Sequence, residues 1–162
     1  MIDRMDQLLA RAKRSGTAFA VLFMDIDHFK DVNDAHGHES GDLVLRAFAQ
    51  RLTKSVRQSD TVARIGGDEF VIILETVHQV KEADTVALKV QRALAKAFAM
   101  QRRRVKVTVS IGISFYPENG GEADTLLRAA DYAMYLAKRQ GGNRYVTCLP
   151  GMPRPGEVLE QE

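Results

Sequence analysis

Acidic side chains stand at two points of the 162-residue chain where a strand is expected to end. Asp25 and Asp27 close an apolar run, and Asp68 and Glu69 follow the pair Gly66-Gly67. Because residues two apart on a strand share a face, Asp25 and Asp27 point the same way. If the second segment pairs beside the first, Asp25 and Asp68 converge. Two or three carboxylates at the rim of a sheet form an oxygen-rich site that suits Mg²⁺, which binds protein carboxylates together with substrate phosphates.

These acids also have a plain interpretation, because acidic residues at strand ends are common and usually only solvated. For Asp27 the two interpretations stay open. For Asp68 and Glu69 the preceding glycines favour a site. Bare glycine backbone lets a triphosphate approach closely, and the acids would repel that triphosphate unless a cation lay between them. The single cysteine, Cys148, and the lack of a histidine cluster beside the acids argue against zinc.

The elements that must position these residues follow from the spacing of apolar side chains. Helices are predicted over residues 2–14, 28–35, 41–56, 80–94 and 123–139, and strands over 17–26, 61–65, 69–74, 105–116 and 145–149. Strand 17–26 is apolar on both faces, which predicts a central strand covered by helices. Strand 105–116 alternates apolar and polar residues, which predicts one buried face. The Gly-Gly pair between 61–65 and 69–74 predicts a hairpin.

A hairpin nested among strand–helix units predicts an α+β fold, with a mixed, mainly antiparallel central sheet flanked by helices. Ferredoxin-like and polymerase-palm folds have this arrangement. A doubly wound parallel sheet fits less well, because the hairpin interrupts the alternation. Residues 1–149 are expected to form one domain. Residues 150–162, which contain three prolines, are expected to form a disordered tail.

The composition excludes several classes of protein. A hydrophobic content of 45% with 27% charged residues excludes wholesale disorder. The net charge of +2, without an extended basic groove, argues against a nucleic-acid polymer as partner. No apolar run reaches the roughly 20 residues of a membrane span, and the N-terminus has no apolar signal-peptide core. A cytoplasmic domain without membrane contact is therefore expected.

Residues 64–70 read Arg-Ile-Gly-Gly-Asp-Glu-Phe. This stretch resembles the signature of the GGDEF family of diguanylate cyclases, and residues 23–42 look like the metal- and guanine-binding stretch of that family. Residues 109–113 and 137–143 resemble its later landmarks. The similarity covers residues 1–148, with the motifs in the order that the family has. It implies a nucleotidyl-cyclase-like fold with a GGDEF β-hairpin.

The resemblance implies an enzyme that condenses two GTP molecules into cyclic di-GMP and two pyrophosphates. Each of two facing domains in a transient homodimer would present one GTP, and each 3′-hydroxyl would attack the α-phosphate of the other GTP. Two Mg²⁺ ions, or Mn²⁺ in their place, would be held by Asp25, the carbonyl of Ile26, Asp68 and Glu69. Asp68 and Glu69 are the implied catalytic residues, with Glu69 as a further metal ligand or as the acceptor of the 3′-hydroxyl proton.

The resemblance also implies a substrate-binding set, namely Phe29, Lys30, Asn33, Asp42, Gly66, Gly67 and Lys138. The Asp42 carboxylate would accept both N–H donors of the guanine edge, and the Asn33 amide would complete the pattern. The alternatives are a turn former at Asn33 and a helix N-cap or first-turn acid at Asp42. Lys30 and Lys138 would neutralise phosphates.

Arg57 and Asp60, with five residues between Asp60 and Gly66, resemble the inhibitory site through which the family binds its product. An arginine can donate two hydrogen bonds to guanine O6 and N7, and the aspartate can accept from guanine N–H groups. The alternative is a plain surface ion pair. The basic run 102–104 is expected to be a solvated strand entry.

Two departures from the family pattern leave an alternative function open. Gly142 stands where many members carry an arginine that contacts phosphate, and Arg144 lies two positions later. The Asp-x-Leu-Thr-Gly-Leu segment that usually precedes the first helix is missing, so we expect a fragment whose isolated turnover is low. The alternative function is a catalytically weak module that binds GTP or cyclic di-GMP and signals to a partner.

Overall fold

The computed structural model describes residues 1–100, 103–150 and 152. The helices are α1 (Ile2–Ser15), α2 (Phe29–His36), α3 (His38–Ser55), α4 (Val80–Leu94) and α5 (Ala123–Arg139). The strands are β1 (Phe19–Ile26), β2 (Thr61–Gly66), β3 (Glu69–Leu74), β4 (Phe98–Met100), β5 (Arg103–Val105), β6 (Val109–Tyr116) and β7 (Tyr145–Thr147). Nearly all of the expected tail, 150–162, lies outside the described residues.

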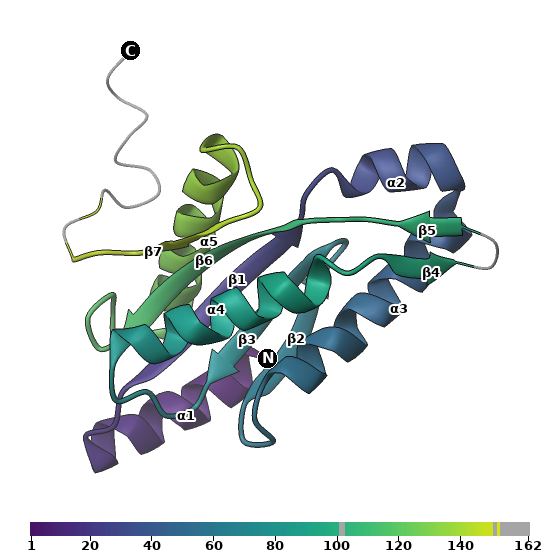
Figure 1. The fold of residues 1–162 in the computed structure, drawn as a ribbon. Helices are drawn as coiled ribbons and strands as arrows, with labels where there is room; N and C mark the ends of the chain where they lie inside the picture. Colours follow the sequence, from purple (N-terminus) through teal and green to yellow (C-terminus); the bar gives the residue numbers. More distant parts are fainter. Residues whose placement is uncertain (101–102, 151, 153–162) are drawn as a thin grey trace.

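A five-stranded sheet forms the centre of the molecule, in the order β2-β3-β1-β6-β7 (Figure 1). Strand β1 pairs antiparallel with both β3 and β6, and β2 pairs antiparallel with β3. Only β7 runs parallel to its neighbour, β6. The predicted mixed, mainly antiparallel α+β fold and the predicted hairpin are therefore confirmed. Strands β4 and β5 form a separate two-stranded hairpin.

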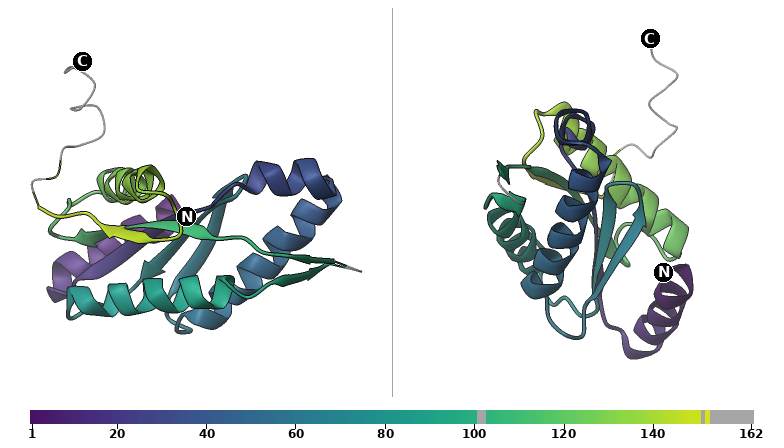
Figure 2. Two further views of the ribbon diagram at one scale, coloured as in Figure 1. Left: turned by 45° about the horizontal axis from the view of Figure 1, so that its top comes forward. Right: turned by 90° about the vertical axis from the view of Figure 1, so that its right-hand side faces the viewer.

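The two faces of β1 belong to two different cores. Its even-numbered residues from Ala20 to Ile26 pack with α2, α3 and α4. Phe19, Val21 and Phe23 pack on the other face with α1 and α5. Figure 2 shows the two helical layers with the sheet between them. Each large apolar side chain buried in this way contributes about 1.5–3 kcal/mol. This confirms the predicted central, helix-covered strand, and it places Asp25 and Asp27 on the α5 side.

The prediction of one strand over 105–116 with one buried face was wrong in both respects. The segment is divided between β5 and β6, because β5 pairs with β4 and not with the main sheet. All eight residues of β6 are buried. Ser110, Gly112 and Ser114 are small, and α5 lies directly on Gly112 and Ser114. A Cβ at Gly112 would lie 1.9 Å from the Ala130 carbonyl oxygen. Alternation of polarity here reflects close helix packing and not exposure to solvent.

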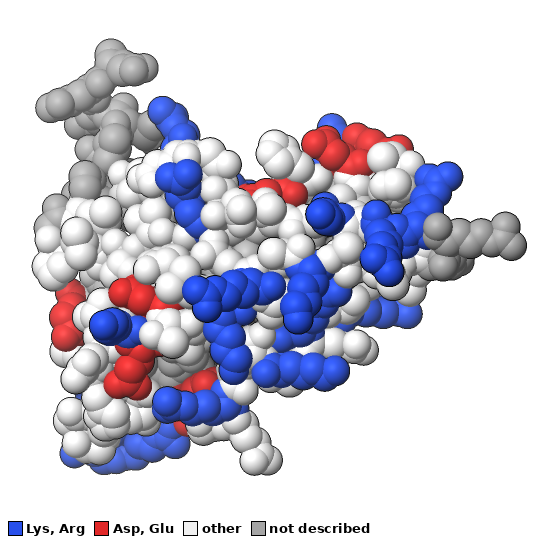
Figure 3. Space-filling model, viewed as in Figure 1, with Lys and Arg blue, Asp and Glu red and all other residues white. Residues whose placement is uncertain are grey.

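Positive charge gathers on one face of the molecule. Lys and Arg side chains lie over α4 and toward the β4–β5 hairpin in the view of Figure 3. Helix α4 covers the sheet face opposite α5. Among the described residues, no helix is both long enough and apolar enough to cross a membrane.

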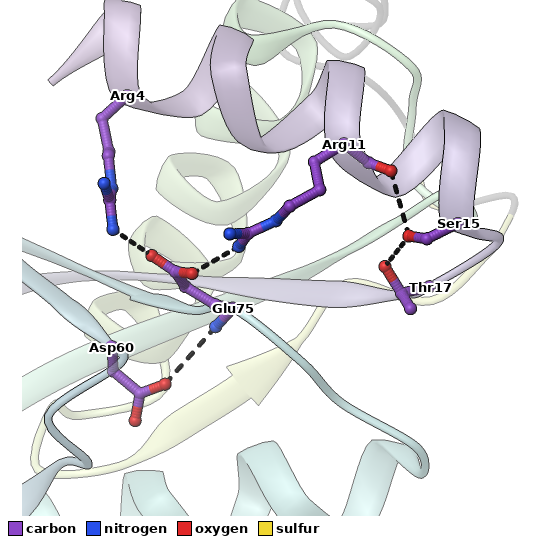
Figure 4. Close-up of polar contacts among 6 residues, drawn as sticks. All are labelled: Arg4, Arg11, Ser15, Thr17, Asp60 and Glu75. Carbon is purple, nitrogen blue, oxygen red and sulfur yellow. Dashed lines mark hydrogen bonds and ion pairs between the residues drawn. The ribbon is translucent and has the colours of Figure 1, made fainter.

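Glu75, directly after β3, joins α1 to the sheet (Figure 4). Its carboxylate accepts hydrogen bonds from Arg4 and Arg11 of α1. Its backbone N–H donates to Asp60 Oδ1 over 3.4 Å. Burial alone would raise the pKa of the Glu75 carboxyl, but the two arginines outweigh burial and hold that pKa below its ordinary value.

Replacing Glu75 by glutamine should lower the free energy of unfolding by about 1–2 kcal/mol at pH 7, because two charge-assisted hydrogen bonds weaken. A carboxyl with a lowered pKa in the folded state stabilises the fold above the unfolded-state pKa. That contribution disappears as the pH falls through the folded-state value. Urea unfolding should therefore show a larger loss at pH 7 than at pH 3. Glu118→Gln, at an exposed position, is the control, and an equal loss at both pH values would contradict the prediction.

Candidate active site

The β2–β3 hairpin brings its turn to the C-terminal end of β1. In the β1–β3 register, Asp25 lies opposite Glu69. The Ile26 N–H donates to the Asp68 carbonyl oxygen over 3.4 Å, and the Asp68 carboxyl is near enough to raise the pKa of the Asp25 carboxyl. The structure therefore brings together the two acids whose convergence the sequence predicted.

Lys138, near the end of α5, supplies positive charge at this point. Its Nζ lies 2.8 Å from Asp25 Oδ1, and the Asp25 side chain is 12% exposed. Burial raises the pKa of the Asp25 carboxyl, Lys138 lowers it and the neighbouring Asp68 charge raises it again. The outcome is a pKa of about 6. Two adjacent carboxylates with only one lysine leave an excess of negative charge, which a further cation would stabilise.

The donors at this point are the carboxylates of Asp25, Asp68 and Glu69 and the Ile26 carbonyl. These are all hard oxygen ligands, which fit Mg²⁺ or Mn²⁺. Glu69 is half-buried at the start of β3. Within the described residues, no three His, Cys, Asp or Glu side chains are grouped closely enough to hold one ion. A two-carboxylate site completed by substrate oxygens is the arrangement that the geometry supports.

The turn of the hairpin exposes its backbone. Gly67 has a φ of 49°, in the left-handed region that favours glycine. The Gly67 carbonyl oxygen accepts a hydrogen bond from Arg64 Nε over 2.8 Å. A Cβ at Gly66 or Gly67 would meet nothing within 4 Å. The fold therefore leaves room at both glycines for a ligand to approach the chain.

Asn33 and Asp42 come from two consecutive helices, α2 and α3. The Asn33 side chain lies against the Gly41 backbone, where a Cβ would be 1.9 Å from Asn33 Oδ1 and 3.2 Å from Phe29 Cζ. Asn33 lies inside α2, so the turn-former alternative is wrong. Helix α3 begins at His38, three residues before its predicted start, so Asp42 lies within the helix and the cap alternative is also wrong. Lys30 is exposed on α2.

Asp42 opens into a cleft of about 390 Å³ between α3 and the hairpin. Its lining residues are Asp42, Leu45, Arg46, Ala49, Thr53, Val62, Arg64 and Phe70. The volume lies within the range of about 300–1,000 Å³ that is typical of small-molecule sites. Arg46 and Arg64 add positive charge that the sequence analysis did not assign to a site. Arg64 could have been noticed from its place two residues before Gly66, whereas Arg46 gave no local signal.

The two residues of the expected inhibitory site are linked through the backbone. Asp60 Oδ2 accepts a hydrogen bond from the Arg57 backbone N–H over 2.9 Å. Asp60 Oδ1 accepts the bond from Glu75. Arg57 itself is exposed. Because the contact uses the backbone of Arg57 and not its guanidinium, the structure does not show the plain ion pair that was the alternative.

Asp27 is not exposed to solvent, so the interpretation of Asp27 as a solvated strand-end acid is wrong. It is 8% exposed. Its Oδ1 accepts from Ser110 Oγ over 2.6 Å, and its Oδ2 accepts from Thr108 Oγ1 over 2.6 Å and from the Asn143 N–H over 2.9 Å. These three partners carried no signal in the sequence, because they are distant from Asp27 along the chain.

Comparison with known proteins places this arrangement in a family. Residues 1–144 match the family described as diguanylate cyclase, GGDEF domain, and the chain belongs to that family. The bifunctional diguanylate cyclase/cyclic di-GMP phosphodiesterase MucR of Pseudomonas aeruginosa is 46% identical over 143 residues, which are 88% of this chain and 21% of MucR. The diguanylate cyclase TpbB of P. aeruginosa is 38% identical over 138 residues, which are 85% of this chain and 32% of TpbB.

Solved structures agree with the family and with the fold. The crystal structure of the GGDEF domain of TpbB matches with a TM-score of 0.89 at 36% identity, covering 91% of this chain and 92% of that one. The GGDEF domain of DgcB from Caulobacter crescentus, in complex with cyclic di-GMP, matches with a TM-score of 0.82 at 29% identity, over 90% of this chain and 86% of that one. The chain spans only about a fifth of MucR and a third of TpbB.

Gly41→Ala should weaken GTP binding about tenfold, because the new Cβ displaces the Asn33 amide and one good base contact is worth about 1–3 kcal/mol. The amide is the end of a flexible side chain, so the fold should survive. Gly121→Ala, where a Cβ meets nothing within 4 Å, is the matched control. Titration calorimetry with GTP measures both. Equal GTP affinity in the two variants would contradict the placement of Asn33 in a base site.

Proposed function

We propose that this chain is the catalytic domain of a diguanylate cyclase, which condenses two GTP molecules into cyclic di-GMP and two pyrophosphates. One observation carries the proposal: Asp25 and Asp68 meet beside Lys138 and an open glycine turn, in a chain of the GGDEF family. The charge balance of that site favours a divalent cation with a triphosphate.

Asp25, the Ile26 carbonyl, Asp68 and Glu69 would hold two Mg²⁺ ions, or Mn²⁺ in their place. When bound, these ions would polarise the α-phosphate and favour loss of the proton from the attacking 3′-hydroxyl. Glu69, half-buried at the start of β3, would accept that proton. Lys138, which neutralises Asp25 in the absence of substrate, would turn its ammonium to the phosphates.

The Asn33 and Asp42 side chains would select guanine. The Asp42 carboxylate accepts from two N–H groups on the Watson–Crick edge of guanine. Adenine presents a lone pair where guanine has its ring N–H, so the same carboxylate would repel it. Phe29 supports the Asn33 side, and Lys30 would neutralise phosphate from α2.

The reaction needs two domains, because each 3′-hydroxyl attacks the GTP that the facing domain holds. Turnover would therefore depend on a transient homodimer and on protein concentration. Gly142 removes one cation that many members of the family use on phosphate. Weaker triphosphate binding with intact chemistry is the expected result.

Cyclic di-GMP would inhibit the enzyme at Arg57 and Asp60. The exposed Arg57 guanidinium is free to donate to guanine O6 and N7. The related domain of DgcB was solved in complex with cyclic di-GMP, which supports a product-binding role for this chain.

A second candidate is a catalytically weak module that binds GTP or cyclic di-GMP and signals to a partner. Gly142, in place of the arginine that many members carry, favours this candidate. Binding without turnover, even when dimerisation is forced, would distinguish it from the enzyme.

Asp68→Ala should lower the yield of cyclic di-GMP by about 100-fold or more, because removal of a metal ligand removes several kcal/mol of transition-state stabilisation. The test is to incubate concentrated protein with GTP and Mg²⁺ and to measure cyclic di-GMP by chromatography. Asp6→Asn, on the exposed side of α1, is the control for loss of an acid. Equal yields from wild type and Asp68→Ala would refute the proposed site.

Arg57→Ala should weaken the binding of cyclic di-GMP by about 10- to 100-fold, since a bidentate arginine–guanine contact is worth about 1–3 kcal/mol. Initial turnover should be unchanged. Calorimetry with cyclic di-GMP measures the first effect and product formation the second. Arg14→Ala, another exposed arginine, is the matched control. Unchanged product affinity in Arg57→Ala would remove the inhibitory site from the proposal.

A further inference from the structure

We infer that Asp27 is a positioning residue, which holds the turn of residues 141–143 after α5 and through it fixes Lys138 beside Asp25. The inference rests on the proposed function, because Lys138 is placed there among the phosphate-binding groups. Asp27 itself is not assigned to metal or substrate.

The Asp27 carboxylate joins three segments of the chain. Its own strand, β1, ends one residue earlier. Thr108 and Ser110 donate to it from the start of β6, and the Asn143 N–H donates to it from the turn after α5. All three donors are uncharged and their distances lie between 2.6 and 2.9 Å. Both oxygens of the Asp27 carboxylate therefore accept hydrogen bonds from neutral donors, whereas Lys138 contacts Asp25.

The turn that Asp27 holds has an unusual backbone. Three successive residues have positive φ: Gly141 at 107°, Gly142 at 71° and Asn143 at 50°. A non-glycine residue in this region, such as Asn143, persists only where its surroundings hold it. The hydrogen bond from the Asn143 N–H to Asp27 is one side-chain contact that holds this backbone. Arg144 Nε, which donates to the Gly142 carbonyl oxygen over 3.2 Å, is another.

Gly142 lies directly on the carboxylate. A Cβ there would be 3.1 Å from Cγ, Oδ1 and Oδ2 of Asp27. The positive φ and this close approach both favour glycine, and an arginine at this position would strain the same contact. Glycine at this position therefore suits both the backbone of the turn and its contact with Asp27.

The same turn holds the last residues of α5. The Gly141 N–H donates to the Lys138 carbonyl oxygen, and the Gly142 N–H donates to the Ala137 carbonyl oxygen, each over 3.0 Å. Lys138 is thus held by its backbone through the turn on Asp27, and by its side chain on Asp25. Asp25, in β1, contacts the Lys138 ammonium, and Asp27, directly after β1, holds the turn that binds the Lys138 carbonyl oxygen. One consequence is that the ammonium needs only side-chain rotation to pass from Asp25 to a phosphate.

The experiment is a double-mutant cycle of Asp27→Ala and Lys138→Ala, with GTP affinity measured by calorimetry. Each single variant should weaken GTP binding about tenfold, and the double variant should be no weaker than Lys138→Ala alone, because Asp27 acts through Lys138. Additive losses would mean a general structural role for Asp27 and would overturn the inference.

Amide hydrogen exchange at Asn143 gives a readout that does not depend on nucleotide. It should be about tenfold faster or more in Asp27→Ala than in wild type. Asp27→Asn should stay protected, because the amide oxygen can accept from Asn143 while its NH₂ donates to the Ser110 hydroxyl. Ser110→Ala loses a β6 contact but not the turn and should also stay protected. Unchanged exchange in Asp27→Ala would overturn the inference.

If Asp27→Ala does not fold, Gly142→Ala disturbs the contact from the other side. Gly16→Ala is its matched control, because Gly16 has a similar φ of 66° but a Cβ there meets nothing within 4 Å. Gly142→Ala should weaken GTP binding about tenfold and Gly16→Ala should not. Equal GTP affinity in these two variants would overturn the inference alone. Failure of wild type to bind GTP would instead overturn the proposed function, and the inference with it.

Discussion

Negative charge concentrated at the end of one buried strand is the constraint on which the rest of this site depends. Strand β1 is the middle strand of the sheet, so its last acids cannot turn freely to water. The fold stabilises them in two different ways. Asp25 has a cation, Lys138, and a competing acid, Asp68. Asp27 has only neutral donors. The Asp25 carboxylate, beside a second acid, can still attract a further cation. The Asp27 carboxylate already accepts hydrogen bonds at both of its oxygens.

The difference between Asp25 and Asp27 follows from the layered arrangement of the sheet and its helices. Basic side chains gather over α4 (Figure 3), and the sheet lies between α4 and α5. The contacts to Asp25 and Asp27 come from elements that end at the same place: the hairpin turn, the start of β6 and the end of α5. Each of these brings one or two side chains to β1, and none of them is close to it in sequence. The geometry of the site consequently depends on how the hairpin turn, β6 and α5 pack together at the end of β1.

Much of this arrangement could be predicted from sequence, since it depends on local pattern. The apolar run ending at Asp25, the Gly-Gly hairpin and the long amphipathic helices all form where the spacing predicts. The predictions from sequence fail where polar residues are buried. The alternating pattern predicts that Ser110 and Ser114 lie on the solvent-exposed face of a strand, yet both are wholly buried under α5. Likewise, no local pattern could show that Asp27 finds its donors at residues 108, 110 and 143, because only the folded chain brings them together.

The close packing of α5 on β6 at Gly112 determines where the end of α5 lies. At Gly112 the helix backbone touches the strand backbone without an intervening side chain, between Ala130 and Met134. Lys138 lies one helical turn after Met134. A methyl group added at Gly112 would therefore push α5 away from β6 and move the Lys138 ammonium away from Asp25. Glycine at position 112 thus lets α5 pack close to β6, in the position that brings Lys138 beside Asp25.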